Sequence, residues 1–168
     1  LPSPGKSVAS DDDATATAVN PANLAFLPAP EARWMWTYTG NESTVGSLPG
    51  HAIDLASPLW LFGGGVRVEL HDPPTPEREF ADFPANYQWV RLGLAGRIDD
   101  WFAIGANLAF SISDSPSLGG QVSSTVGFTL RPTQYVSLSG LVRDFNAPVS
   151  RDDQTTSFRS WEAGLAVR

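Results

Sequence analysis

The sequence has no cysteine and only one lysine, Lys6, among its eleven basic residues. Without thiols the chain cannot form a disulfide scaffold, an iron–sulfur cluster or a thiolate zinc site. It has no apolar run of the ~18 residues that a membrane-spanning helix needs. Charged residues make up 17% of the chain, below the ~25% usual for soluble domains. The net charge of −7 argues against nucleic-acid binding through phosphate neutralisation.

After residue 30, apolar residues alternate with small or polar residues at the period of two that is typical of β-strands. The clearest case is residues 102–113. One face of this segment carries Phe102, Ile104, Ala106, Leu108, Phe110 and Ile112. The opposite face carries only Ala, Gly, Asn and Ser. Related patterns predict further strands, about eight in all, at residues 33–38, 44–56, 60–69, 88–97, 121–131, 135–143 and 160–168.

The connections between the expected strands alternate in length. Short turns are expected at Ser57-Pro58, at residues 97–101 and at 131–134, and longer loops at 71–86, 114–120 and 144–157. If each strand reverses direction, the short turns lie at one end of the sheet and the loops at the other, as in outer-membrane barrels. The sequence therefore predicts an all-β fold, an antiparallel up-and-down transmembrane β-barrel over residues 31–168. Residues 1–30 form a separate N-terminal segment.

The second face of the strands distinguishes a membrane barrel from a soluble β-sandwich, because a soluble surface needs many charged side chains. Here that face is mostly Gly, Ala, Ser, Thr and Asn, which suits the crowded inside of a barrel. We expect its six charged residues to point into the lumen and to form ion pairs; they are Arg33, Arg67, Glu69, Arg91, Arg143 and Glu162. Aromatic residues near strand ends suit interfacial girdles; they are Trp34, Trp60, Tyr87, Trp101 and Tyr135. A soluble β-sandwich that binds partners through its loops is an alternative.

The N-terminal segment carries the most specific motif of the chain. Residues 7–14 read SVASDDDA and residues 18–25 read AVNPANLA. Small residues, acidic residues and then an N-P-A-G-L-A-like motif resemble the start of FadL-type outer-membrane transport proteins, although Asn23 stands where that family usually has Gly. The resemblance covers about 20 residues.

This resemblance implies that the N-terminal segment is a plug inside the barrel and that the protein passively transports small hydrophobic compounds across the bacterial outer membrane. It marks Asn20, Pro21, Ala22 and Leu24 as candidate plug or ligand residues. It also marks Gly63, Gly64 and Gly65 as a candidate strand kink, where a hydrophobic ligand could leave sideways. Close packing of these glycines against the plug is the alternative. The expected partners are outer-membrane lipid, a hydrophobic small molecule, and a downstream domain or partner chain.

A structural role competes with transport. FadL-type barrels have more strands than the eight expected here, and the chain ends at Arg168 rather than at the aromatic residue with which outer-membrane barrels usually finish. We therefore expect the N-terminal part of a longer protein, with a self-sufficient eight-stranded barrel as the alternative. The opening also looks similar to the N-terminal part of myxobacterial SppA-like signal peptide peptidases. In that case the chain is a membrane anchor, and the protease lies downstream of it.

The sequence predicts no catalytic site, no cofactor and no metal site. Only His51 and His71 could serve a hydrolase triad, and neither has a recognisable serine and carboxylate partner. We interpret the acidic run 11–13 as a helix start or a solvated stretch, because three consecutive carboxylates do not converge on one ion without a special turn.

Overall fold

The computed structural model describes residues 7–10, 12–37, 50–71, 87–114, 119–149 and 158–167. Its elements are α1 (Ala16–Val19), the 3-10 helix η1 (Pro21–Phe26), β1 (Glu31–Thr37), β2 (Gly50–Leu59), β3 (Phe62–His71), β4 (Tyr87–Asp99), β5 (Phe102–Ser113), β6 (Val122–Thr133), β7 (Val136–Arg143) and β8 (Ser160–Val167). In the described part of the chain, no helix is long and apolar enough to span a membrane.

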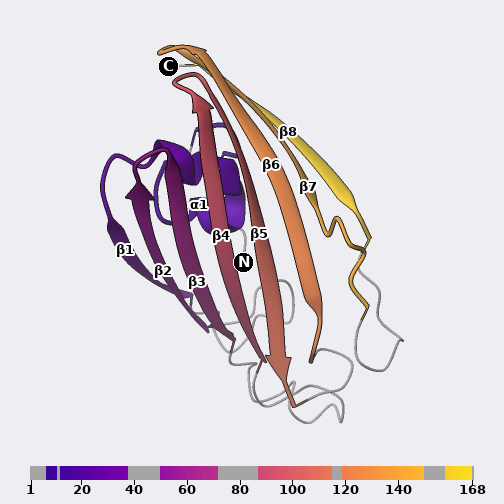
Figure 1. The fold of residues 1–168 in the computed structure, drawn as a ribbon. Coiled ribbons are helices and arrows are strands. Elements are labelled where there is room, and N and C mark those ends of the chain that lie inside the picture. The colour runs from indigo at the N-terminus through magenta and orange to yellow at the C-terminus, as the bar shows by residue number, and fades with distance from the viewer. Residues whose placement is uncertain are drawn as a thin grey trace.

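All eight strands belong to one antiparallel sheet in which each strand pairs with its neighbours in sequence, in the order β1 to β8. This confirms the predicted all-β, antiparallel, up-and-down fold. The sheet is not closed, because β1 and β8 do not pair with each other in the described part of the chain. A closed eight-stranded barrel has an interior that side chains alone fill. The helices α1 and η1 also lie on one face of this sheet, which curves around them (Figure 1).

The two faces of the sheet differ as the alternation predicts. We call the face covered by α1 and η1 the inner face and the opposite one the outer face. In β5, the burial pattern alternates strictly from Ala103 to Leu108, with Ala103, Gly105 and Asn107 buried on the inner face. Ile104 and Leu108 are exposed on the outer face. The core therefore lies between the sheet and the N-terminal segment.

The turn between β2 and β3 is a correction to the sequence analysis, which placed it at Ser57-Pro58. Strand β2 runs on to Leu59, and the turn is at Trp60 and Leu61, with Trp60 at φ 64°. Pairing of β1 with β2 stops at Ala56, so Pro58 lies where β2 has β3 as its only paired neighbour. Proline is tolerated there because no ladder hydrogen bond is lost.

The other two short turns overlap the predicted ranges 97–101 and 131–134 but are shorter. Strand β4 extends to Asp99 and strand β6 to Thr133, so the turns are at residues 100–101 and 134–135. Register shifts near the ends of both strands absorb the extra residues, one between Arg97 and Asp99 and one between Leu130 and Thr133. The expected loops 71–86, 114–120 and 144–157 lie mostly outside the described residues, as do residues 44–49 of the second expected strand.

Candidate functional site

The candidate site is the interface between the inner face of the sheet and the plug segment, by which we mean residues 7–10 and 12–27. The plug segment contains α1 and η1, and η1 contacts β2 to β6. Figure 1 shows both helices within the curve of the sheet. The segment thus lies against one face of an open sheet.

Glycines on four neighbouring strands allow the plug segment to approach the sheet backbone. A Cβ atom at Gly63 would overlap the carbonyl oxygen of Leu24, and one at Gly105 would lie 2.5 Å from the nitrogen of Ala22. Similar overlaps involve Gly65 with Thr17, Gly93 with Leu24 and Gly127 with Asn20. At Gly63 and Gly105 the obstructing atoms belong to the backbone of η1, so no side chain fits there while the plug segment is bound. The sheet is therefore shaped for this segment.

The register of the strands aligns these small residues. Gly63 on β3 is opposite Ala95 on β4, Ala95 is opposite Gly105 on β5, and Gly105 is opposite Gly127 on β6. A row of residues without bulky side chains therefore crosses four strands beneath η1. We call this row the glycine trench.

The predicted strand kink at Gly63–Gly65 takes a different form. The pairing of β3 with β2 and with β4 continues through all three glycines without a register shift, so there is no β-bulge. Gly63 and Gly65 face the plug segment, whereas the nearest atoms to a Cβ at Gly64 would be Leu59 Cδ1 at 3.5 Å and Gly93 O at 4.0 Å. The close-packing alternative accounts for Gly63 and Gly65.

The predicted plug residues lie at the centre of the interface. Asn20, Pro21, Ala22 and Leu24 are all buried. The Asn20 amide donates to the carbonyl of Val8 at 2.9 Å and to Thr129 Oγ1 at 3.1 Å, while its oxygen accepts from the Ala22 N–H at 3.1 Å. Asn20 thus caps η1 and joins it to β6.

Asn23, which departs from the family motif, has a defined place in the same interface. Its side chain is buried, its amide donates to the carbonyl of Val8 at 3.2 Å, and its oxygen accepts from Thr129 Oγ1 at 2.6 Å. A glycine would supply neither hydrogen bond. The departure therefore strengthens the contact between the plug segment and β6.

Two inner-face side chains satisfy backbone carbonyls of the short helix α1. Asn107 donates to the carbonyl of Thr17 at 2.7 Å. Arg143 donates to the carbonyls of Ala18 at 2.9 Å and Val19 at 3.1 Å. The last carbonyls of a helix have no partner within it, and buried carbonyls without partners are costly. These bonds therefore fix the end of α1 against the sheet.

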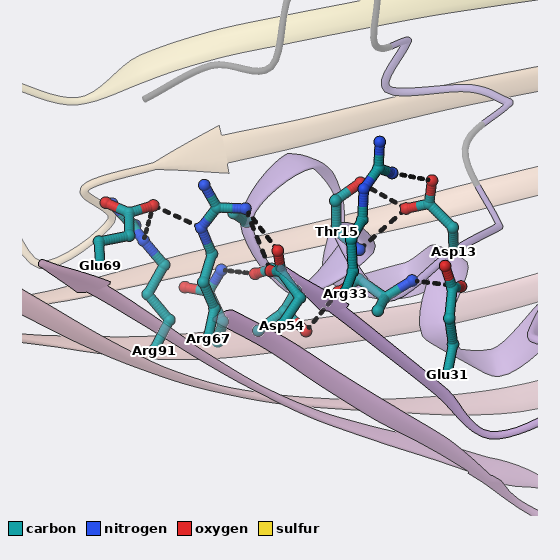
Figure 2. Close-up of polar contacts among 12 residues, drawn as sticks. Asp13, Thr15, Glu31, Arg33, Asp54, Arg67, Glu69 and Arg91 are labelled. Atoms are coloured by element: carbon teal, nitrogen blue, oxygen red, sulfur yellow. Dashed lines mark hydrogen bonds and ion pairs between the residues drawn. The ribbon is translucent and has the colours of Figure 1, made fainter. Parts of the chain in front are cut away.

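The acidic run lies at a helix start, as predicted, because the Asp13 side chain accepts from the N–H of Thr15, just before α1, at 2.8 Å. It is not a solvated stretch, because Asp12 and Asp13 also bind the sheet. Asp13 pairs with Arg33 of β1 at 3.0 Å (Figure 2), and Asp12 forms two hydrogen bonds with Arg131. The Arg131 guanidinium also lies 4.1 Å from the centre of the Phe26 ring. Asp11 lies outside the described residues. Sequence spacing cannot reveal these pairs, because their partners are 20 and 119 residues away.

A buried ion cluster occupies the inner face beside the plug segment (Figure 2). The Arg67 side chain is 1% exposed; its Nη1 lies 3.1 Å from each oxygen of Asp54, and its Nε lies 2.5 Å from Glu69 Oε1. Arg91 Nε is 3.7 Å from the same Glu69 oxygen, and His71 Nε2 is 3.5 Å from the other. Asp54 was missed as a site residue, although its alternation with Ile53 and Leu55 places it on the inner face.

The remaining inward charges also form pairs. Arg143 Nε lies 2.5 Å from Glu162 Oε1 and joins β7 to β8. Arg159, which is closer to Glu162 in the sequence, instead donates to the carbonyl of Phe145 at 2.9 Å. All six predicted charges thus lie on the inner face and take part in ion pairs.

The outer face exposes large apolar side chains on every strand, with Trp34, Ile53, Val66, Leu92, Leu108, Val126, Leu138 and Trp161 as examples. An apolar groove of about 1240 Å³ crosses β5 to β8 on this face. Of the expected girdle residues, Trp60, Trp101 and Tyr135 lie on the three short turns and are 89%, 47% and 58% exposed. Trp34 stacks on His51 within the sheet, and Tyr87 begins β4 and contacts His71.

Comparisons with models of known families, with curated proteins and with solved structures found no match. Within the described ranges, no group of three or more His, Asp or Glu side chains is arranged to hold a metal ion.

Proposed function

We propose that this chain forms the wall of a bacterial outer-membrane β-barrel and that its N-terminal segment is the plug. One observation carries the proposal: large apolar side chains lie exposed on the outer face, while polar and charged side chains such as Arg67, Glu69 and Asn107 are buried on the inner face. In water an exposed apolar surface of this extent would cause aggregation. In a bilayer it meets acyl chains, and the inverted pattern becomes favourable.

Strand length and the turn aromatics support this orientation. Strands β2 to β6 contain between 10 and 13 residues, close to the ~9–11 that a tilted strand needs to cross a bilayer. Trp60, Trp101 and Tyr135 sit together on the short-turn end, where a membrane interface favours aromatic rings. The short turns would then lie on the periplasmic side of the outer membrane.

Lipid contact can be measured by refolding the chain into phosphatidylcholine vesicles and comparing brominated with ordinary acyl chains. Bromine quenches nearby tryptophans, so we expect the fluorescence of Trp34 and Trp161 to fall in the brominated vesicles. Tryptophan variants that retain a single ring assign the signal to one strand. A chain that stays folded and monodisperse without lipid or detergent, with no quenching, would refute the membrane assignment and favour a soluble β-domain.

We further propose that the barrel passes small hydrophobic compounds when the plug segment moves. Supporting features are the FadL-like plug motif, its docking on the wall, and the apolar groove over β5 to β8, which could receive a compound released into the membrane. The competing role is a structural anchor for a further domain. It is favoured by the ion pairs and hydrogen bonds that fill the inner face.

A reversible tether of the plug segment separates these two roles. A Cβ at Gly65 would lie 3.4 Å from the Cβ of Thr17, close to the ~3.5–4.5 Å of a disulfide. In T17C/G65C, transport predicts that oxidation slows uptake of a hydrophobic dye by cells and that reduction restores it. The wild-type protein, which lacks cysteine, controls for the oxidant. Equal uptake in both redox states, no faster than in cells without the protein, would support the anchor.

A further inference from the structure

The open sheet needs more strands than this chain contributes among its described residues. Eight strands close into a barrel whose interior is just filled by side chains. Here the inner face also holds α1 and η1, which pack directly on the backbone of β3 to β6. The sheet therefore cannot close on itself while the plug segment is bound.

We propose that a second copy of this chain closes the sheet, with β8 of each copy pairing with β1 of the other. The need for closure rests on the proposed function, because backbone groups at a sheet edge cannot remain unpaired in lipid. In the described part of the chain, β1 pairs only with β2, and β8 only with β7. A second copy completes both edges of both chains at once.

The two edges are complementary in direction and length. An up-and-down sheet with an even number of strands has edge strands that run in opposite directions. Strand β8 can therefore pair with a neighbouring β1 in the antiparallel manner of the seven existing pairs. Strand β1 contains 7 residues and β8 contains 8. The new seam would be as long as the shorter strand.

The side chains at the two edges also match. On the outer face, Trp34 of β1 and Trp161 and Leu165 of β8 are 64%, 76% and 63% exposed, so both edges continue the apolar surface. On the inner face, the edge charges are opposite, with Arg33 on β1 and Glu162 on β8. Their side chains are 36% and 40% exposed, against 1% and 3% for Arg67 and Glu69 in the interior of the sheet. These edge charges retain room for a further partner.

A twofold axis along the barrel closes this arrangement without leaving an edge. Two copies would bring together about sixteen strands, a number at which barrels enclose a channel rather than a packed core. Such an interior has room for both plug segments. A closed barrel of two chains thus pairs both sheet edges and leaves space for both plug segments.

Engineered cysteines test this seam, since the natural chain has none. We would fold W34C and L165C separately and mixed into detergent micelles, add a short bismaleimide, and measure the mass of the protein part by light scattering. The expected results are a mass of twice 18.0 kDa before cross-linking and a covalent dimer in the mixture only. L108C, which is 48% exposed at the centre of β5, is the control that should not cross-link with either variant.

The alternative outcomes are distinct. A mass of one chain, with no cross-link in the mixture, would overturn the proposal and leave closure to other strands. Cross-linking of W34C with itself would show that β1 edges pair with each other and would overturn the head-to-tail seam. Quenching by brominated lipid together with a one-chain mass rejects the seam alone. A cross-linked dimer without quenching rejects the membrane assignment and leaves the seam standing.

Discussion

The glycine trench predicts that adding a single Cβ at one of its glycines weakens the docking of the plug segment, and Gly105 is the best position for the test. An added Cβ in G105A would lie 2.5 Å from both the nitrogen of Ala22 and the carbonyl carbon of Pro21, and 2.7 Å from the Ala22 Cα. All three are backbone atoms of η1, so no side-chain rotation relieves the overlap. Either η1 or β5 must move, and overpacking of this kind costs about 1–3 kcal/mol.

Gly96 supplies the matched control, because it lies on the neighbouring strand β4 and faces outward. A Cβ there would meet only the ring of Phe62, at 3.5 Å and 3.6 Å, which is ordinary contact. Both substitutions reduce the freedom of the unfolded chain equally, an effect that by itself stabilises by about 0.4–1 kcal/mol. The difference between G105A and G96A therefore isolates the contact with the plug segment.

Urea titration of each variant in lipid vesicles, followed by tryptophan fluorescence, measures this difference. We expect G105A to unfold at lower urea than the wild type, and G96A to unfold at equal or higher urea. Brief proteolysis before the titration should cut the plug segment faster in G105A, since its docking is weakened. Equal midpoints and equal cleavage for the two variants would refute the trench as the seat of the plug segment.

Three further substitutions test the outer face, the buried ion cluster and the anchor of α1. L108R places a charge at the centre of β5 on the outer face, and we expect it to lower the free energy of unfolding in vesicles by about 2–4 kcal/mol. No loss of stability in a urea titration in vesicles would contradict lipid contact at this position. D54A leaves Glu69 as the remaining close carboxylate of the buried Arg67, and we expect the same titration to show about 3–5 kcal/mol of destabilisation. The milder D54N should keep part of the contact with Arg67. Equal stability of D54A and the wild type would show that the Asp54–Arg67 pair contributes nothing. N107A leaves the Thr17 carbonyl without its hydrogen bond from Asn107. We expect the free energy of unfolding to fall by about 1–3 kcal/mol and amide hydrogen exchange in α1 to become faster. Unchanged exchange would mean that Asn107 does not hold the helix.

The strands could be predicted from the sequence because their pattern is local. The alternation at Ile104, Leu108 and Phe128 places these residues on the outer face in the structure, as expected. The turn at Trp60-Leu61 could not be predicted, because neither residue is a usual turn former, while the nearby Ser57-Pro58 is a typical turn pair. Trp60 adopts a positive φ that its own chemistry does not favour.

The candidate site was only partly predictable, since its contacts join distant parts of the chain. The inward charges follow from strand parity, and so does Asp54, which we missed. The pairing of Asp12 with Arg131 and of Asn20 with Thr129 depends on how the segment lies across the sheet, which no local pattern encodes. Strand parity predicts that Gly63, Gly105 and Gly127 share the inner face, but the long loops 71–86 and 114–120 leave the register between their strands open. The alignment of these glycines in the glycine trench therefore required the structure.

The strict neighbour-to-neighbour order of the strands has a consequence for the order of assembly. Every hairpin can form from adjacent sequence, whereas the plug segment must wait for β6, whose Thr129 and Arg131 lie 109 and 119 residues beyond their partners Asn20 and Asp12. The segment that precedes the strands in the sequence is thus fixed late, after most of the sheet exists. Until then its apolar and acidic residues stay accessible to chaperones. The segment can dock only when the hairpins are in the correct register, so its docking marks their correct assembly.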